Sequence, residues 1–239
     1  MILSVINYQK RGKDHDSKKN EHYHLWTHSY LLISLWLIGL ACLVTPAWTA
    51  DTADSGQKIS KSGIPYRPDN AQAGPEDLVN AIRARPRGGK LLNLDRMLLH
   101  SPAFARGWNT MFAAIRGQLA LSPKLRELAI MEIGVINKAD CEWVQHVPEF
   151  LAAGGTKAQM EALKDVSTAI NNDKLFDESE RATLGLTYEM TRNITVSDGT
   201  MARVRAILPD QQVVELVGTI AGYNMVSRFL VATGIEVEE

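Results

Sequence analysis

The sequence predicts an all-α protein, and three observations lead to this fold class. Apolar residues in the second half of the chain recur three and four positions apart, as they do on one face of a helix. A Ser, Thr or Asp stands in front of most of these segments, where the N-cap of a helix is expected. No stretch alternates apolar and polar residues in the manner of a half-buried strand. We therefore expect a compact helical domain.

The first fifty residues differ from the rest of the chain. A charged and polar stretch, residues 10–19, precedes residues 30–44, a run of fifteen residues without a charge. This run is shorter than the ~20 residues of a spanning helix and fits the ~7–15 of a signal-peptide core. Cleavage after Ala47 or Ala50 would remove it, whereas the run extended to Ala50 would make an uncleaved membrane anchor. Residues 1–50 therefore predict export to a periplasmic or secreted location, either free or attached to the membrane through residues 30–50.

Residues 51–75 are rich in Gly, Pro, Ser and Asp, which predicts a polar linker or an extended arm. The helical domain is expected over residues 76–239. Its first helix, in "PEDLVNAIRARP", stops before Pro86. A short and a longer helix follow in "NLDRMLLHSPAFARGWNTMFAAIRGQL", where Ser101 and Pro102 are the N-cap and first turn of the second.

The next helix, in "SPKLRELAIMEIGVINKA", begins in the same way and has closely helical apolar spacing. Asp140 is expected to cap "CEWVQHVPEFLAAGG", which contains the helix-disfavouring Pro148 and ends at Gly154 and Gly155. The later helices should begin at Thr156, Asp177, Ser197 and Pro209. The last helix is the longest, and together with the apolar helix that begins at Ser122 it should form the core.

Composition excludes several classes of function. The formal net charge is −1 and no basic stripe is present, so nucleic acid is not expected as a partner. No P-loop or GxGxxG followed by a helix is visible, so no nucleotide cofactor is expected. Cys42 lies in the apolar run and would leave with it, so Cys141 would be the one thiol of the processed chain. A small molecule is the expected partner.

The segment "ADCEWVQHVPEF", residues 139–150, contains the candidate catalytic residues. Glu142 and His146 are four positions apart, so they share one face of a helix. This pattern suits a redox site with Cys141, an acid–base site, or an ordinary helix with a paired histidine. A metal site is not expected, because no further histidine lies near.

Two longer segments carry a family resemblance. Residues 125–163, "LRELAIMEIGVINKADCEWVQHVPEFLAAGGTKAQMEAL", resemble the carboxymuconolactone decarboxylase family and its alkylhydroperoxidase D relatives. Residues 213–236, "VVELVGTIAGYNMVSRFLVATGIE", are similar to the C-terminal helix of the decarboxylase-like branch. The resemblance covers about residues 90–236. It implies the all-helical alkylhydroperoxidase D-like fold, assembly into a homotrimer or hexamer, and sites near subunit contacts.

The resemblance also separates two branches of the family. The alkylhydroperoxidase branch has a glutamate, a CxxC pair and a histidine four residues after the second cysteine. Here Glu127 and His146 match the glutamate and the histidine, but Ala139 and Glu142 occupy the cysteine positions. Dithiol peroxidase turnover needs two thiols that close into a disulfide. The chain therefore resembles the decarboxylase-like branch without the CxxC pair, and peroxidase activity is the weakest of three alternatives.

The resemblance implies a cofactor-independent lyase acting on a small cyclic carboxylic acid or lactone. Loss of CO2 from such a substrate leaves a carbanion conjugated with the carbonyl, so no metal or cofactor is required. His146 is the expected proton donor, with Glu142 as its orienting or proton partner and Glu127 facing the same cavity. Three residues of the last helix are expected to bind the substrate: Tyr223, Asn224 and Arg228.

Each of these residues also has a plain structural interpretation. His146 and Glu142 can form an ordinary pair one helical turn apart, and Glu127 can be a first-turn glutamate favoured by the helix dipole. The three residues of the last helix can serve subunit packing. The alternative to the lyase is therefore a non-catalytic, exported binding member of the fold.

Overall fold

The structure is a computed structural model that describes residues 57–85 and 89–238. The leader or anchor expected in residues 1–50, with the export and membrane attachment that depend on it, lies outside the described residues. Over the described ranges, no helix is both long enough and apolar enough to cross a bilayer.

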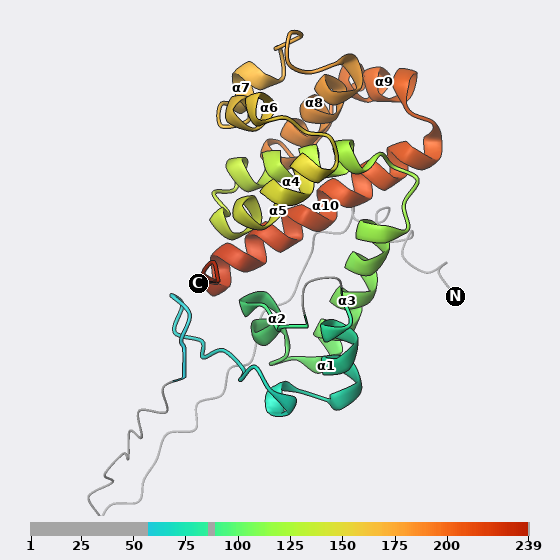
Figure 1. Cartoon of the computed structure of the whole chain (residues 1–239). Helices are drawn as coiled ribbons and strands as arrows, with labels where there is room; N and C mark the ends of the chain where they lie inside the picture. The colour runs from blue at the N-terminus through green and yellow to red at the C-terminus, as the bar shows by residue number, and fades with distance from the viewer. Residues whose placement is uncertain (1–56, 86–88, 239) are drawn as a thin grey trace, which may run out of the picture. The chain divides into compact units, whose positions relative to one another are not determined.

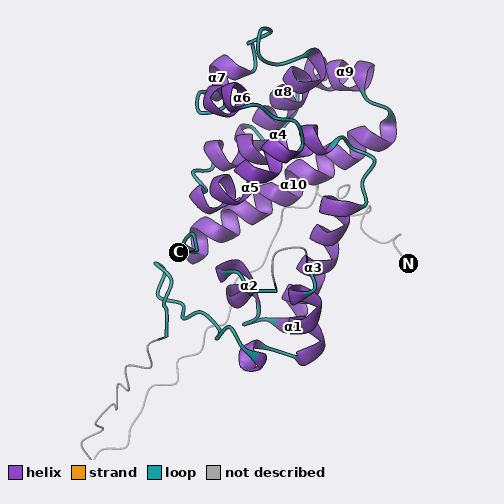
Figure 2. Cartoon of the chain, in the orientation of Figure 1, coloured by secondary structure: helices purple, strands orange, loops and turns teal. Residues whose placement is uncertain are grey.

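The regular secondary structure of the described residues is helical, which confirms the predicted fold class (Figures 1 and 2). Within them there is no strand, only one isolated bridge between Ile59 and Pro65. The elements in chain order are η1 (Ala71–Ala73), α1 (Glu76–Arg83), α2 (Asn93–Leu98), α3 (Pro102–Gly117), α4 (Pro123–Ile136), α5 (Asp140–Ala152), α6 (Lys157–Ala162), α7 (Val166–Ala169), α8 (Glu178–Arg192), α9 (Asp198–Ile207) and α10 (Asp210–Thr233).

Local capping chemistry explains several of the helix starts. The side chains of Thr156, Asp177 and Ser197 accept backbone N–H bonds from the third residue of α6, α8 and α9. Asp140 is not the N-cap predicted for α5. Ala139 occupies that position, and Asp140 is the first helical residue, where its charge still favours the helix dipole.

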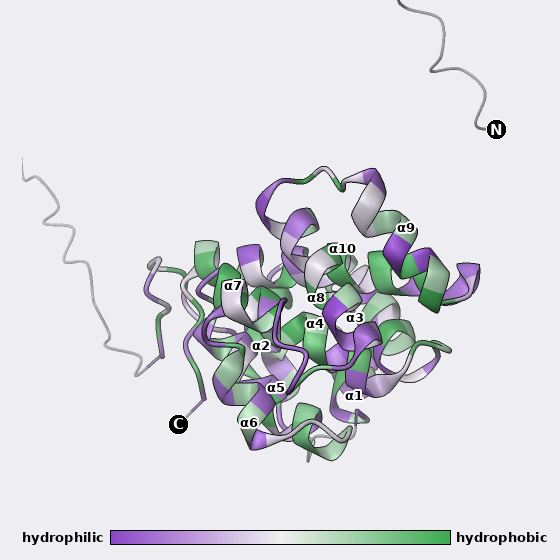
Figure 3. Cartoon of the chain, turned by 90° about the horizontal axis from the view of Figure 1, so that it is seen from above, coloured by the Kyte–Doolittle hydropathy of each residue, from purple (hydrophilic) through white to green (hydrophobic). Residues whose placement is uncertain are grey.

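Helices α4 and α10 provide the centre of the core, as the sequence predicts. Helix α4 packs against α5, α8 and α10, and most of its side chains are buried, including Leu128, Ile130 and Ile133. Leu216 and Ile220 of α10 are also fully buried. Figure 3 shows hydrophobic residues along these helices. This packing fixes α5, which carries Glu142 and His146, against α4.

The polar stretch before η1 runs as an extended arm along the C-terminal end of the chain. The backbone N–H of Lys61 donates to the carbonyl of Gly234 at 3.1 Å. Tyr66 is fully buried, and its hydroxyl accepts a hydrogen bond from the backbone N–H of Glu236 at 3.2 Å. The arm therefore adds a large aromatic side chain to the core.

Candidate active site

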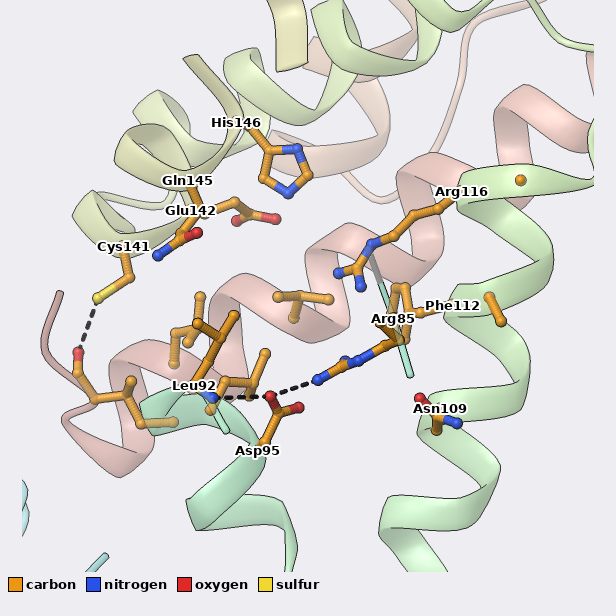
Figure 4. Close-up of a pocket in the computed structure, with 16 residues that line it drawn as sticks. Arg85, Leu92, Asp95, Asn109, Phe112, Arg116, Cys141, Glu142, Gln145 and His146 are labelled. Carbon is orange, nitrogen blue, oxygen red and sulfur yellow. Dashed lines mark hydrogen bonds and ion pairs between the residues drawn. The ribbon is translucent and has the colours of Figure 1, made fainter. Parts of the chain in front are cut away.

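A cavity of about 310 Å³ is lined by α3, α5, α10 and the residues around α2 (Figure 4). Eight of the sixteen lining residues are apolar and eight carry polar or charged atoms. The apolar part consists of Leu92, Leu94, Phe112, Ala113, Gly117, Val226, Leu230 and Ile235. The polar part consists of Arg85, Asp95, Asn109, Arg116, Cys141, Glu142, Gln145 and His146. Both residues of the predicted Glu142–His146 face thus line one cavity.

A buried carboxylate behind the cavity wall orients His146. Nδ1 of His146 lies 2.7 Å from Oε2 of Glu127, and Nε of Arg126 donates to Oε1 of the same carboxylate at 3.1 Å. Burial acts to raise the pKa of Glu127, but the hydrogen bonds and charges of His146 and Arg126 outweigh it, so the pKa is lowered. An ionised Glu127 accepts the Nδ1–H, and Figure 4 shows the imidazole ring pointing into the cavity.

Glu142 has a different environment although it lies only one turn from His146. Its side chain is 2 % exposed, and neither carboxyl oxygen has a hydrogen-bond partner among the described residues. Burial raises the pKa of Glu142 well above its usual range, and the charge of Arg116 opposes this only in part. Burial therefore favours the neutral carboxylic-acid form of Glu142. The hydrogen bond that orients His146 through Nδ1 comes from Glu127, not from Glu142.

Arg116 supplies a positive charge that the sequence did not identify as part of a site. Its Nε donates to the hydroxyl of Tyr223 at 3.0 Å, and its guanidinium lies 5.5 Å from the ring centroid of Phe112. Figure 4 shows the guanidinium across the cavity from Glu142 and His146. The one available signal was spacing, because Arg116 follows Phe112 by four residues and so shares its buried helix face.

A second arginine lies at another part of the wall. Nη2 of Arg85 is 2.5 Å from Oδ2 of Asp95, which also accepts the backbone N–H of Leu92 at 3.0 Å. Burial raises the pKa of Asp95 despite this ion pair. Arg85 and Asp95 were also missed by the sequence patterns, since neither belongs to a recognisable motif.

The three residues of α10 predicted to bind substrate are not among the cavity-lining residues. Tyr223 is fully buried behind the wall, where its ring makes an edge contact with His146 at 5.2 Å. Asn224 donates to Thr191 at 2.9 Å, and Arg228 donates to Oδ1 of Asn224 at 2.6 Å. Tyr223 thus acts on the site through Arg116 and His146, and substrate binding by Asn224 and Arg228 stays a prediction without a contact in this cavity.

Cys141 has the environment of an unreactive thiol. Its Sγ donates to the carbonyl of Ile235 at 3.2 Å, and burial together with nearby carboxylates raises its pKa to about 11. It is the one cysteine of the described residues. In the same part of the chain, no group of three or more His, Cys, Asp or Glu side chains is arranged to hold a metal ion.

Comparison with known families and structures supports the resemblance seen in the sequence. Residues 102–178 match the model of the carboxymuconolactone decarboxylase family. This region extends from α3 to the start of α8 and contains Arg116, Glu127, Glu142 and His146. No curated protein sequence matches the chain.

Several solved structures share the fold at low sequence identity. An uncharacterized peroxidase-related protein from Ralstonia eutropha JMP134, described as an alkylhydroperoxidase AhpD core, has a TM-score of 0.61 and 17% identity over 72% of this chain and 90% of its own. A peroxidase-related protein from Silicibacter sp. TM1040 has a TM-score of 0.60 and 18% identity, covering 69% and 86%. The debrominase Bmp8 in complex with 2,3,4-tribromopyrrole has a TM-score of 0.60 and 14% identity, covering 76% and 94%. The expected alkylhydroperoxidase D-like fold is thereby confirmed.

Proposed function

Because residues 102–178 match the carboxymuconolactone decarboxylase family, we propose that the protein is a cofactor-independent lyase that acts on a small cyclic carboxylic acid or lactone. The cavity volume of about 310 Å³ suits a ligand of this size. The apolar half of the lining suits a ring, and the guanidinium of Arg116 suits a negative charge on it. The family match and the composition of the cavity thus support the same class of substrate.

One observation carries the proposal, and it is the ion pair between His146 and Glu127 at the cavity wall. The 2.7 Å contact holds Nδ1 against a carboxylate, which favours the protonated imidazole and fixes the ring orientation. An imidazolium in this position can deliver a proton through Nε2. The fixed orientation of the ring supports the proposed role of His146 as the general acid.

The proposed reaction can be written with residues of this chain. Arg116 neutralises the anionic substrate, and the bond between the ring carbon and its carboxylate breaks as CO2 leaves. The electron pair of that bond spreads to the conjugated carbonyl as an enolate. Transfer of the Nε2 proton of His146 to carbon restores the carbonyl, and water then returns a proton to the imidazole.

The test is turnover of conjugated γ-lactones that carry a carboxylate, followed by CO2 release and by deuterium incorporation at carbon in D2O. We expect His146→Ala to lower turnover by about 10²–10⁴-fold, the usual contribution of a positioned general acid. His100→Ala is the matched control, because His100 is exposed and bonds the carbonyl of Pro65 outside the cavity. Equal turnover in wild type and His146→Ala would remove His146 from the mechanism.

A wild-type protein that binds these lactones without converting them would instead favour the non-catalytic binding alternative. A peroxidase alternative finds no support in the site. The thiol of Cys141 is bonded to a carbonyl, and its raised pKa of about 11 leaves little thiolate at neutral pH.

A further inference from the structure

Glu142 is the buried polar group for which the fold provides no partner. Both carboxyl oxygens lack a hydrogen bond within the described part of the chain, although the side chain is only 2 % exposed. A buried carboxyl group in this condition destabilises a protein by roughly 1–3 kcal/mol or more. The side chain lines the cavity, and Figure 4 shows its carboxyl group beside His146. A bound ligand is therefore the natural partner of this group.

The charges around Glu142 determine which form of the carboxyl group a ligand meets. Six other charged or titratable groups surround this part of the cavity: His146 on α5 itself, Arg116 on α3, Glu127 on α4, Tyr223 on α10, and Arg85 and Asp95 around α2. Arg116 is the cation that acts on Glu142, and burial outweighs its effect, so the pKa of Glu142 is raised. The Nε–H of Arg116 already donates to Tyr223, and the remaining N–H groups of the guanidinium would bind an anionic ligand. Two carboxylates facing one guanidinium would repel each other.

We propose that Glu142 is a neutral carboxylic acid whose O–H donates a hydrogen bond to the ligand oxygen that becomes negative when CO2 leaves. This role rests on the proposed lyase function and deepens it, because it assigns stabilisation of the enolate to Glu142 and proton delivery to His146. The proton of Glu142 stays on Glu142 throughout. A preorganised donor of this kind is worth most in a cavity shielded from water.

The protonation state can be measured on the full chain without any ligand. We expect the infrared spectrum at pH 7 to contain a carboxylic-acid C=O band that disappears in Glu142→Gln. The matched control is Glu132→Gln, which removes the other deeply buried, unpartnered glutamate and should leave the Glu142 band in place. A difference spectrum between wild type and Glu142→Gln that contains only an ionised carboxylate would overturn the proposal.

The hydrogen bond to a ligand needs a probe that cannot react, and 5-oxotetrahydrofuran-2-carboxylate is a saturated lactone of the right class. On binding, the Glu142 band should move in wild type, and the Glu132 band should not. By calorimetry at pH 7, Glu142→Gln should bind within about three-fold of wild type, because its amide N–H replaces the O–H. Glu142→Leu should bind about ten-fold or more weakly, since it has no donor.

The outcomes separate this role from the lyase proposal. Equal affinity of wild type and Glu142→Leu, or a band that does not move on binding, would overturn the role of Glu142 and leave the lyase intact. Failure of wild type to bind the probe while the acid band is present would overturn the proposed ligand class, and the role with it. Should the variants not fold, the movement of the wild-type band on binding still tests whether Glu142 donates a hydrogen bond to the ligand.

Discussion

Because His146 pairs with Glu127 rather than with Glu142, the pKa values of the two glutamates are shifted in opposite directions. His146 and Arg126 lower the pKa of Glu127, whereas burial raises the pKa of Glu142. Sequence spacing placed Glu142 and His146 on one helix face and the family resemblance singled out Glu127, so these three candidate residues, unlike Arg85 and Arg116, were predictable. Their pairing was not, because a spacing of four residues fixes a shared face but not which carboxylate is closer across helices.

Removing the charge of Glu127 should weaken His146 as a general acid without abolishing this role. In Glu127→Gln the amide oxygen can still accept the Nδ1–H of His146, but the imidazolium loses its counter-charge. We expect kcat to fall by about ten-fold, less than in His146→Ala, with KM nearly unchanged. The measurement is the kcat and KM pair over a pH series. A large rise in KM at constant kcat would show that Glu127 acts on binding instead.

The same substitution makes a prediction about stability, with a definite sign. The folded-state pKa of Glu127 lies below the ordinary value of 4.5, so its ionised form stabilises the fold above that pH. This contribution is lost as pH falls through the folded-state pKa. Thermal unfolding should therefore show Glu127→Gln less stable than wild type at pH 7, with the difference narrowing below about pH 4.5.

For Glu132 we expect the opposite pH dependence of the free energy of unfolding. It is fully buried on α4, neither oxygen has a partner among the described residues, and burial raises its pKa well above 4.5. Its stabilising neutral form is complete below the unfolded pKa and is lost as pH rises toward the folded-state pKa. Glu132→Gln should therefore stabilise the protein at pH 8 by about 1 kcal/mol or more and flatten the decline above pH 4.5. Chemical denaturation of wild type and Glu132→Gln at pH 4 and pH 8 measures the gain in stability and its pH dependence. A variant that is less stable than wild type at pH 8 would contradict the prediction.

At the scale of elements, the helices and their starts were largely predictable because capping and turn chemistry is local. Thr156, Asp177 and Ser197 cap as expected, and Gly234 ends α10 in the left-handed conformation with φ 62°. Pro148 lies inside α5 without ending it. The residue is on the exposed side of the helix.

The turn after α5 contains a glycine that packing requires. A Cβ on Gly155 would lie 2.4 Å from the ring of Phe150, which is fully buried. Because neither the ring nor the backbone can move freely, Gly155→Ala should destabilise the fold by about 1–3 kcal/mol. Gly107→Ala is the control, since nothing lies within 4 Å of its Cβ in the middle of α3. That change should stabilise by roughly 0.5–1 kcal/mol. Unfolding midpoints compare the two, and equal effects would rule out the packing explanation.

At the scale of the whole molecule, the cavity was the least predictable feature. Its wall combines residues from α1–α2, α3, α5 and α10, which are far apart in the chain and carry no common motif. Periodicity identifies which face of each helix is buried, but it does not say where buried faces leave a space between them. The arginines Arg85 and Arg116 were missed for this reason, because a single charge on an amphipathic helix usually lies at the protein surface.

The arm that ends in η1 connects the core to the cavity wall, which leads to a prediction about the whole chain. Tyr66 is buried and accepts the N–H of Glu236, and the same C-terminal segment contributes Ile235 to the cavity. Glu238 continues the connection, because its carboxylate accepts hydrogen bonds from the backbone of Asn93 and the side chain of Gln145, both at 2.7 Å. Loss of Tyr66 should therefore loosen the cavity wall as well as the core.

We expect Tyr66→Ala to destabilise the protein by about 3–5 kcal/mol, the usual effect of removing a large buried aromatic side chain. Tyr66→Phe keeps the ring and loses only the hydrogen bond to Glu236, so about 0.5–1.5 kcal/mol is expected. The coupling to the cavity is measured by alkylation of Cys141 in a Cys42→Ser background. The thiol is held against the carbonyl of Ile235, so Tyr66→Ala should be alkylated faster than Tyr66→Phe under native conditions. Equal alkylation rates, with the stability difference present, would mean that the arm supports the core alone and that the cavity wall is held independently by Glu238.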